Sequence, residues 1–354
     1  MLLPLPPKRT GALLTRFARC VARDVVQGQH NVNYILPLGA ALLLGVVRSG
    51  PVKFRVPREA VKVVPRIWSE AQVLGVVAEH LDGVPRFLRR RGSGSVHEFV
   101  AGWALSSLPE SAAPPGEKEL MGKFARFFAD LGDVPADALP ARPNGWPADG
   151  DSDGFLDWLV DFVDNDVRGG PNQELFGPLF DALLVPDTAM KDFKGQRERL
   201  ARRPFRLLHT DVHQANVVLT DEGEISVIDW ELALYGDPLH ELATHMVRMG
   251  YDAAQQSTMA GIWASTMTER GQEEIVTGYE HDLWVYRDFE HAQSIYPDVM
   301  RAALDLRDGR VEMDAAKARI HRALRVAQEP LMLRKMPQDP EIEDALQWWV
   351  SEHK

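Results

Sequence analysis

The sequence is poor in cysteine and has no long apolar run. Cys20 is the only cysteine among 354 residues, so no intrachain disulfide can form. This is typical of a reducing compartment, and we expect a cytoplasmic protein. No stretch of about 18 or more apolar residues occurs, so we expect no membrane-spanning helix and no membrane partner. The first seven residues hold three prolines, and no charged segment precedes an apolar core, so the N-terminus does not read as a signal peptide.

The sequence also lacks an excess of basic residues. Its net charge of −11 argues against nucleic acid as a partner, because proteins that bind the phosphate backbone need basic surface. Acidic residues gather between Asp149 and Asp187, where Arg168 is the only base. This acidic stretch predicts either a solvated helix face with loops or a surface that attracts a cationic substrate.

The first hundred residues have the pattern of a small sheet. NYILPL, ALLLGVV, VKFRV and VHEFV are strand-like pieces separated by glycine and proline. The longest apolar stretch, residues 40–47, has the length of a buried strand. Residues 68–80 differ, because their apolar positions recur at helical spacing. We therefore expect a strand-rich N-terminal lobe over residues 1–102.

The remaining residues, 103–354, are mainly helical in pattern. Apolar residues recur at helical spacing in 116–132 and 153–163, and the text between them, rich in proline, glycine and aspartate, predicts a loop. The pattern after Asp237 is helical apart from breaks near Gly250, Gly271 and Gly309. Both patterns together predict an α+β protein whose larger, mainly helical C-terminal lobe begins near Gly102.

Residues 209–229 carry the polar side chains on which the function depends. Two short apolar strands, 217–219 and 225–228, flank a turn sequence and predict a hairpin. Folding that hairpin brings its open ends together, so that Asn216 meets Asp229. An amide oxygen and a carboxylate can share Mg²⁺, which prefers oxygen ligands. Asp211 lies five residues before Asn216, where its carboxylate can face a hydroxyl nucleophile, the arrangement that phosphoryl transfer requires.

Two other functions are compatible with parts of this segment. In a strand, His209, Asp211 and His213 would project to one face, and H-x-D-x-H is a possible zinc arrangement for a metal-dependent hydrolase. That alternative leaves Asn216 and the hairpin to Asp229 unexplained. A nucleotide-binding protein without transferase activity is a further alternative, although all three core residues are present.

The strings HTDVHQAN and IDWE resemble the catalytic loop and metal-binding segment of eukaryotic-like kinases, H-x-D-x-x-x-x-N followed by a metal-binding aspartate. The second histidine and D-W-E in place of D-F-G are similar to the aminoglycoside phosphotransferase family, which includes choline kinase-like and macrolide phosphotransferase-like enzymes. GDPLHELA resembles that family's G-D-P-x-x-D-L-A, with Glu241 in place of the usual aspartate. The resemblance implies a two-lobed protein kinase-like fold, Mg²⁺ as cofactor, and ATP or GTP as phosphate donor.

The resemblance also implies roles in the first lobe. GQHNVNY is similar to a G-x-x-N-x-x-Y turn over the nucleotide phosphates, and VKFRVPR to the strand that carries a phosphate-contacting base. The register puts Arg55 at that position, with Lys53 as second choice, and Glu70 as its acidic partner. HEFVAG, residues 97–102, looks like the hinge whose backbone binds the base. The implied nucleotide-binding residues are Gly28, Asn31, Arg55, Glu70, Glu98, Phe99 and Val100.

Several neighbouring residues are expected to support this site. We expect His209 and His213 to hold the catalytic loop, Asp237 to organise the turn after the metal segment, and Trp230 to pack. For Glu231 the sequence predicts either a role in local structure or a role near the metal.

The leading prediction is an enzyme, an O-phosphotransferase that acts on a hydroxyl of a small molecule, with an antibiotic as the first candidate. Asp211 is its catalytic residue, and Asn216 and Asp229 are its metal ligands. Metabolite kinases of the choline, homoserine or sugar type are the alternative within this class. The acidic stretch favours a cationic acceptor, whereas VKFRVPR favours a macrolide-type enzyme.

Overall fold

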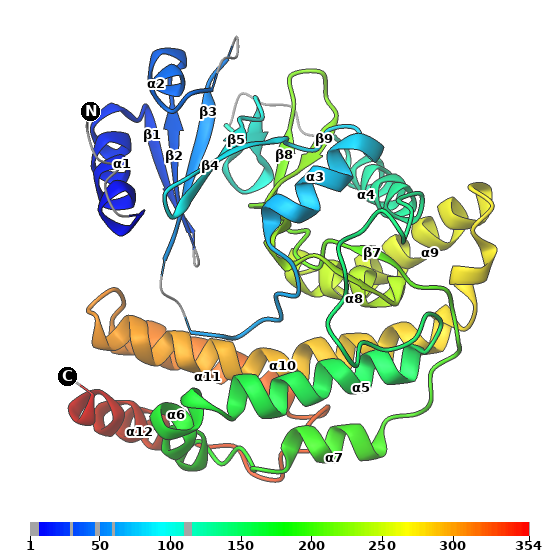
Figure 1. Ribbon diagram of the computed structural model, residues 1–354. Helices are drawn as coiled ribbons and strands as arrows, with labels where there is room; N and C mark the ends of the chain where they lie inside the picture. The colour runs from blue at the N-terminus through cyan, green and yellow to red at the C-terminus, as the bar shows by residue number, and fades with distance from the viewer. Residues whose placement is uncertain (1–6, 29–30, 47–49, 59–60, 110–114, 354) are drawn as a thin grey trace. The chain divides into compact units, whose positions relative to one another are not determined.

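The computed structural model describes residues 7–28, 31–46, 50–58, 61–109 and 115–353. The chain divides into two compact units, each built from segments distant in sequence (Figure 1). The sheet unit comprises residues 1–61, 68–141 and 211–233, and the helical unit comprises residues 62–67, 142–210 and 234–354. The sheet unit thus includes residues 103–141 and the hairpin segment, whereas the lobe boundary near Gly102 remains a prediction. The predicted α+β class is confirmed.

An antiparallel five-stranded sheet of order β1-β2-β3-β5-β4 forms the centre of the sheet unit. Its strands are β1 Asp24–Gln27, β2 Asn31–Leu36, β3 Val52–Pro57, β4 Phe87–Arg91 and β5 Gly94–Glu98. One face is apolar, because Tyr34, Val52, Phe54 and Val96 lie in one buried cluster. Helices α1 (Pro7–Val21) and α2 (Leu38–Leu43) add Ala18, Ala40 and Ala41 to that cluster.

Helix α2 occupies residues 40–43 of the strand expected over residues 40–47 and contradicts it there, while residue 47 lies outside the described residues. Ala40, Ala41 and Leu44 are buried in the apolar cluster, a spacing that suits one face of a helical turn. A short apolar run can form either a buried strand or a buried helix, and the sequence pattern alone does not distinguish the two. Here the packing of these side chains favours the helix. Helix α1 had no counterpart in the predicted pattern.

Two further helices and a small sheet complete the sheet unit. Helix α3 (Glu70–His80) begins at a capping box in which Ser69 and Gln72 bond each other's backbone, within the predicted range 68–80. Helix α4 (Glu117–Gly132) buries its phenylalanines, also as predicted. The small sheet has the order β6-β8-β9, formed by Trp103–Ala104, Val217–Leu219 and Ile225–Val227, and short 3₁₀ turns occupy Leu105–Ser107 and Trp230–Leu232.

The helical unit has a two-stranded sheet, β7 (Arg206–Leu208) with β10 (Leu234–Gly236), and eight α-helices within its described residues. The helices are α5 Ser152–Phe162, α6 Pro171–Ala182, α7 Ala189–Gln196, α8 Pro238–Met249, α9 Ala253–Glu269, α10 Tyr279–Arg307, α11 Met313–Ala327 and α12 Asp339–Glu352. A π-helix, Val163–Arg168, continues α5, and a 3₁₀ turn covers Glu273–Val276. The predicted breaks near Gly250, Gly271 and Gly309 are confirmed, since each glycine has a positive φ.

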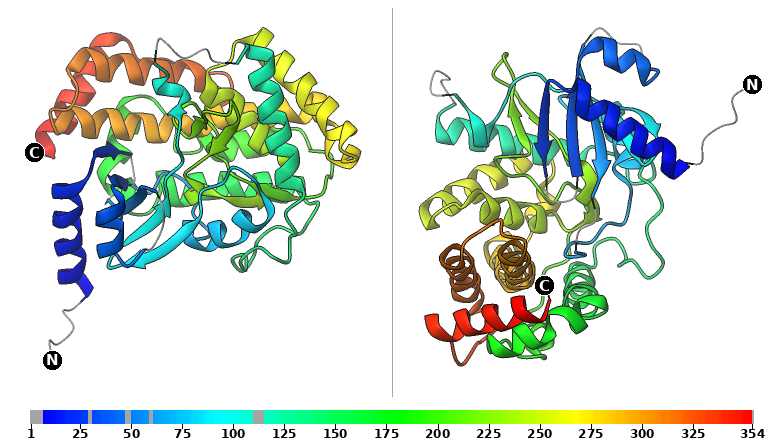
Figure 2. Two further views of the ribbon diagram at one scale, coloured as in Figure 1. Left: turned by 90° about the horizontal axis from the view of Figure 1, so that it is seen from above. Right: turned by 90° about the vertical axis from the view of Figure 1, so that its left-hand side faces the viewer.

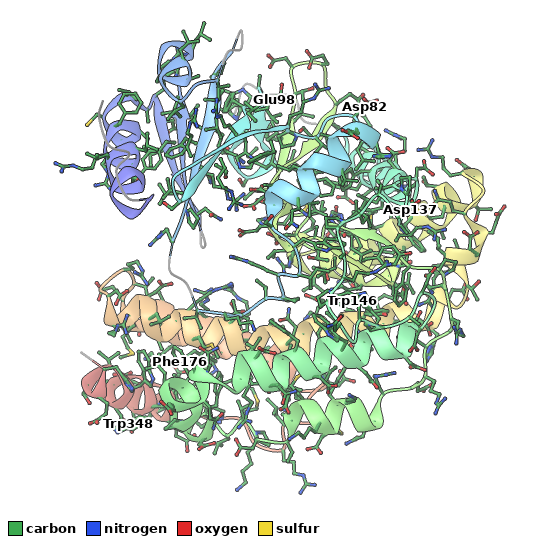
Figure 3. All side chains as sticks on the ribbon, viewed as in Figure 1. Asp82, Glu98, Asp137, Trp146, Phe176 and Trp348 are labelled. Carbon is green, nitrogen blue, oxygen red and sulfur yellow. The ribbon has the colours of Figure 1, made fainter. Side chains whose placement is uncertain are left out.

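Aromatic contacts and a buried ion network hold the helical unit together. Helices α10 and α11 lie side by side (Figure 2). Phe176 on α6 stacks on the ring of Trp349 of α12, while the neighbouring Trp348 is exposed (Figure 3). Arg203 is fully buried and bonds both Asp237 and Asp282. No described helix is long and apolar enough to cross a membrane.

Candidate active site

The hairpin brings its two ends together as expected. Val217 pairs with Val227, and the N–H of Ile228 donates to the carbonyl of Asn216 at 2.9 Å. The connecting turn is closed by a hydrogen bond from Thr220 N–H to the carbonyl of Glu224, with Gly223 at φ 80°. Asn216 and the residues that follow β9 are therefore held at one end of the hairpin.

The side chain of Asn216 orients Asp211. Its Nδ2 donates to Asp211 Oδ2 at 2.8 Å and to the Asp211 carbonyl at 3.0 Å. His213 Nε2 lies 3.6 Å from the other carboxylate oxygen of Asp211. Because the amide nitrogen of Asn216 is used in this way, its amide oxygen is the atom that suits a cation. His213 contacts Asp211 directly, so the supporting role expected for it is consistent with its position.

Asp229 has a left-handed backbone, with φ 72° and ψ 62°. Aspartate tolerates this conformation better than most residues, and such strain is concentrated at functional sites. Trp230, the next residue, is fully buried, lies edge-on to Phe127, and donates its indole N–H to the carbonyl of Val227 at 3.0 Å. The packing role expected for Trp230 is confirmed, and this packing fixes the chain at Asp229.

Arg55 lies at the centre of an ion-pair cluster. Its guanidinium contacts Glu70 at 2.8 Å, Asp229 at 2.7 Å and Glu231 at 2.9 Å. Only 3% of Arg55 is exposed, and burial alone would lower its pKa. The three carboxylates outweigh burial and raise the pKa of Arg55 above its usual range, so the group stays charged. The Arg55–Glu70 pair predicted from the resemblance is therefore formed, and the same guanidinium also reaches the predicted metal ligand.

Glu231 is the site residue that the sequence left open. It binds Arg55 and also accepts a hydrogen bond from Asn31 Nδ2 at 3.0 Å. Glu231 thus joins the start of β2 to β3 and to the metal segment. The only sequence signal for this role was a second acid, two residues after Asp229 in IDWE.

The turn predicted over the nucleotide phosphates is described only in part. The N–H of Gly28 donates to the carbonyl of Asn31 at 2.9 Å. The intervening residues of GQHNVNY, 29–30, lie outside the described residues. Tyr34, the last residue of that motif, lies on the apolar face of the sheet and contacts Phe54 instead of the site.

The predicted hinge, residues 97–102, begins in the last two residues of β5 and continues beyond that strand. Glu98 ends that strand (Figure 3), and its backbone N–H donates to the carbonyl of Arg86 at 2.9 Å. Phe99 and Val100 are half-buried and have no regular structure. A Cβ on Gly102 would lie 2.2 Å from the carbonyl oxygen of Leu219, so the chain passes β8 at a distance that only glycine permits. Base binding by residues 98–100 remains a prediction.

Glu241 holds the backbone that leads into the catalytic loop. Its carboxylate accepts the backbone N–H groups of His209 and Thr210, the latter at 2.8 Å. Thr210 has φ 60°, a conformation that a β-branched residue rarely adopts, and it directly precedes Asp211. Glutamate thus organises the loop backbone where the family usually has aspartate. His209 is fully buried, as expected of a structural residue.

Asp237 has the organising role expected of it. It caps helix α8, accepting the N–H of Leu239 at 3.0 Å, and it bonds Arg203.

The zinc arrangement considered as an alternative is not formed. Among the described residues, no three histidine, cysteine, aspartate or glutamate side chains gather as a metal site. The alternation of His209, Asp211 and His213 required a strand, but β7 ends at Leu208 and Thr210 has a positive φ. The backbone geometry therefore removes the basis of that alternative.

The acidic stretch is largely neutralised by bases of the same unit. Arg197 bonds Asp153 and Asp157, each at 2.6 Å, and Lys194 bonds Asp161 at 2.8 Å. Both bases lie in or directly after α7. Three carboxylates of the stretch are thus ion-paired on the helix surface, and its attraction for a cationic substrate stays a prediction.

Comparisons with known proteins bear on the family and the fold. A family model described as the phosphotransferase enzyme family matches residues 40–274. No curated protein matches the sequence. Similar solved structures include a Ralstonia eutropha protein assigned as an aminoglycoside phosphotransferase, with TM-score 0.59 and 17% identity over 93% of this chain and 99% of that one.

Two more structures share this fold. A macrolide 2'-phosphotransferase from Brachybacterium faecium has TM-score 0.53 and 18% identity over 88% of this chain and 97% of that one. A choline kinase from Streptococcus pneumoniae has TM-score 0.50 and 13% identity over 90% and 98%. The predicted protein kinase-like fold and the predicted small-molecule kinase class are both confirmed. Since the family model spans well over half of the chain, this protein belongs to the phosphotransferase enzyme family.

Proposed function

We propose that this protein transfers the γ-phosphate of ATP or GTP to a hydroxyl group of a small molecule. The observation that carries the proposal is the connected set Asp211, Asn216, Asp229 and Arg55. Asn216 bonds Asp211, and Arg55 bonds Asp229, with all four residues in one compact unit. Positioned carboxylates and a fixed cation are what phosphoryl transfer requires.

Each residue has a defined part in the reaction. Asp211 orients the acceptor hydroxyl and takes up its proton. The hydroxyl oxygen forms a bond to the γ-phosphorus while the bond to the bridging oxygen breaks, and the nucleoside diphosphate leaves. Asn216 and Asp229 supply the oxygen donors that suit Mg²⁺, which when bound neutralises phosphate charge. Arg55 neutralises further phosphate charge, and Glu70 and Glu231 keep its guanidinium in place.

For the acceptor we propose a hydroxylated antibiotic, which would make the enzyme a resistance factor. The fold shared with a macrolide 2'-phosphotransferase supports this choice. A metabolite acceptor such as choline is the second candidate, supported by the fold shared with a choline kinase. Ion pairs within the acidic stretch reduce the negative charge that would favour a cationic acceptor. We further propose a cytoplasmic location, where ATP and GTP are available.

A screen of acceptors tests the proposal. Purified protein is incubated with Mg²⁺, with ATP or GTP, and with macrolides, aminoglycosides, choline, homoserine and sugars one at a time. We expect release of nucleoside diphosphate above the acceptor-free background with one acceptor class, and a product heavier by one phosphoryl group in mass spectrometry. Hydrolysis of acceptors without any phosphorylated product would contradict the proposal.

A further inference from the structure

A surface pocket of about 410 Å³ lies in the helical unit, where helices α11 and α12 meet (Figure 1). It is lined by Ala318, His321, Arg322, Arg325 and Asp339. The first four share one face of α11, because they follow one another at helical spacing, and Asp339 is the first residue of α12. The described residues that line this pocket include none of those assigned to phosphoryl transfer.

The bases of α11 differ in their partners. Lys317 and Arg319, which do not line the pocket, each contact a carboxylate, at 2.7 and 3.2 Å respectively. Arg322 and Arg325 are exposed, and no hydrogen bond or ion pair joins either of them to another residue within the described ranges. In a protein with a net charge of −11, the two arginines that line the pocket are thus left without carboxylates.

The lining of the pocket has a net positive charge. Asp339 supplies its only carboxylate, and Nε2 of His321 already bonds that carboxylate. Two guanidiniums therefore outweigh one carboxylate even when His321 is neutral. The N-terminal end of α12 also favours negative charge, since the helix dipole is positive there. The pocket is therefore suited to an anion.

The size of the pocket and the shape of its cations select the class of anion. Each guanidinium is a planar fork that can donate two hydrogen bonds, and a phosphate has enough oxygens to accept from two such forks. A volume of about 410 Å³ lies within the range of about 300–1,000 Å³ typical of small-molecule pockets and exceeds what a bare phosphate fills. Ala318 and the methylene stems of the arginines offer apolar surface to an organic group.

We propose that this pocket binds an organic phosphate. Arg322 and Arg325 hold its phosphate group, and its organic group lies against Ala318 and the arginine stems. This site is distinct in its residues from the proposed phosphotransferase site, and binding there does not require transfer. The alternative is a pair of solvated guanidiniums with no preferred ligand, and a binding measurement separates the two.

Isothermal titration calorimetry with phenyl phosphate tests the proposal. Phenyl phosphate, inorganic phosphate and benzoate are titrated into the wild type, Arg322→Gln, Arg325→Gln and the double variant. We expect the wild type to bind phenyl phosphate most tightly, because only this probe combines a phosphate with an apolar group. Each single substitution should weaken phenyl phosphate binding on the order of tenfold or more, and the double variant should lose it.

Two further variants are the controls. Arg126→Gln removes an exposed arginine of α4 in the sheet unit, and Arg55→Met alters the candidate active site. Both should bind phenyl phosphate as the wild type does. No saturable binding by the wild type, or an equal loss in Arg126→Gln, would overturn the proposal.

Two other results would also contradict it. Binding that persists in the double variant and disappears in Arg55→Met would place the phosphate in the candidate active site. Equal affinity for benzoate and phenyl phosphate would show that the pocket does not select a phosphate.

Discussion

At the scale of residues, the site depends on how one guanidinium is shared. Arg55 presents two terminal nitrogens, one to Glu70 and one to both Asp229 and Glu231. The planar fork of arginine can serve these carboxylates at once, whereas an ammonium is a single point of charge. Asp229 therefore takes its position from its own left-handed backbone and from Arg55 together.

This geometry predicts the effect of Arg55→Lys. The charge is kept but the fork is lost, so Asp229 and Glu231 are no longer held together. We expect kcat to fall on the order of tenfold or more, the range typical when residues that orient metal ligands are removed. Steady-state kinetics with the acceptor found in the screen measures this. Glu70→Gln is the comparison, since it weakens one contact and leaves the fork intact, and equal activity of wild type and Arg55→Lys would rule out the shared-fork account.

Sequence reasoning reached some of these residues and not others. Asp211, Asn216 and Asp229 could be grouped because a hairpin turn between two short apolar strands determines which ends meet. Arg55 and Glu70 needed the family resemblance, because an arginine on a strand and a glutamate on a helix have no distinctive spacing. The contacts of Glu231 with Asn31 and Arg55 span distant parts of the chain, and no local pattern predicts such contacts.

At the scale of elements, burial decided what local pattern could not. The apolar residues of 40–47 suit either a buried strand or a buried helix, and the packing of Ala41 and Leu44 selected α2. By contrast, α3 and the long helices after Asp237 combine helical spacing with caps or with glycines at their ends, and these elements were predictable.

Helix α8 predicts a pH dependence of stability. His240 is buried among the rings of Phe155, Tyr286 and Phe289, with a carboxylate oxygen of Glu290 3.7 Å from its Nδ1. Burial, with a smaller effect of Arg248, lowers the pKa of His240 to about 3. In the unfolded chain its pKa is about 6.5. Between these two values the unfolded state binds a proton and the folded state does not. The free energy of unfolding should therefore fall as the pH drops below about 6.5, with a contribution of up to ~1.4 kcal/mol per pH unit from this one group.

Denaturant unfolding of wild type and His240→Phe between pH 7.5 and 4.5 measures this contribution. Phenylalanine suits the aromatic surroundings and does not titrate. The number of protons taken up on unfolding, which the slope of the unfolding free energy against pH gives, should therefore fall by about one. His80→Phe, at the exposed end of α3, is the control for the loss of a histidine outside this buried cluster. Identical slopes in wild type and His240→Phe would show that His240 does not contribute.

At the scale of the whole molecule, the compact units do not follow the order of the chain. The hairpin that carries Asn216 and Asp229 belongs to the same compact unit as the five-stranded sheet, although some 120 residues separate it from β5 in the sequence. His209 and Thr210 are anchored by Glu241 in the helical unit, and the next residue, Asp211, belongs to the sheet unit. Sequence patterns predicted a strand-rich part and a helical part, but not this interleaving, because it depends on contacts between distant segments.

We propose that Asp211 acts in the chemical step of transfer and does little for nucleotide binding. Asp211→Asn keeps the shape of the side chain and an oxygen that can accept the hydrogen bond from Asn216. Asp221→Asn, in the exposed hairpin turn, is the matched control and should behave like the wild type.

The decisive measurement compares these variants with the wild type for transfer of labelled γ-phosphate to the acceptor and for the Kd of the nucleotide donor. We expect transfer by Asp211→Asn to fall on the order of 10²–10⁴-fold, with the Kd of the donor close to that of the wild type. Near-normal transfer by Asp211→Asn, or a loss of nucleotide affinity that matches the loss of transfer, would contradict the role assigned to Asp211.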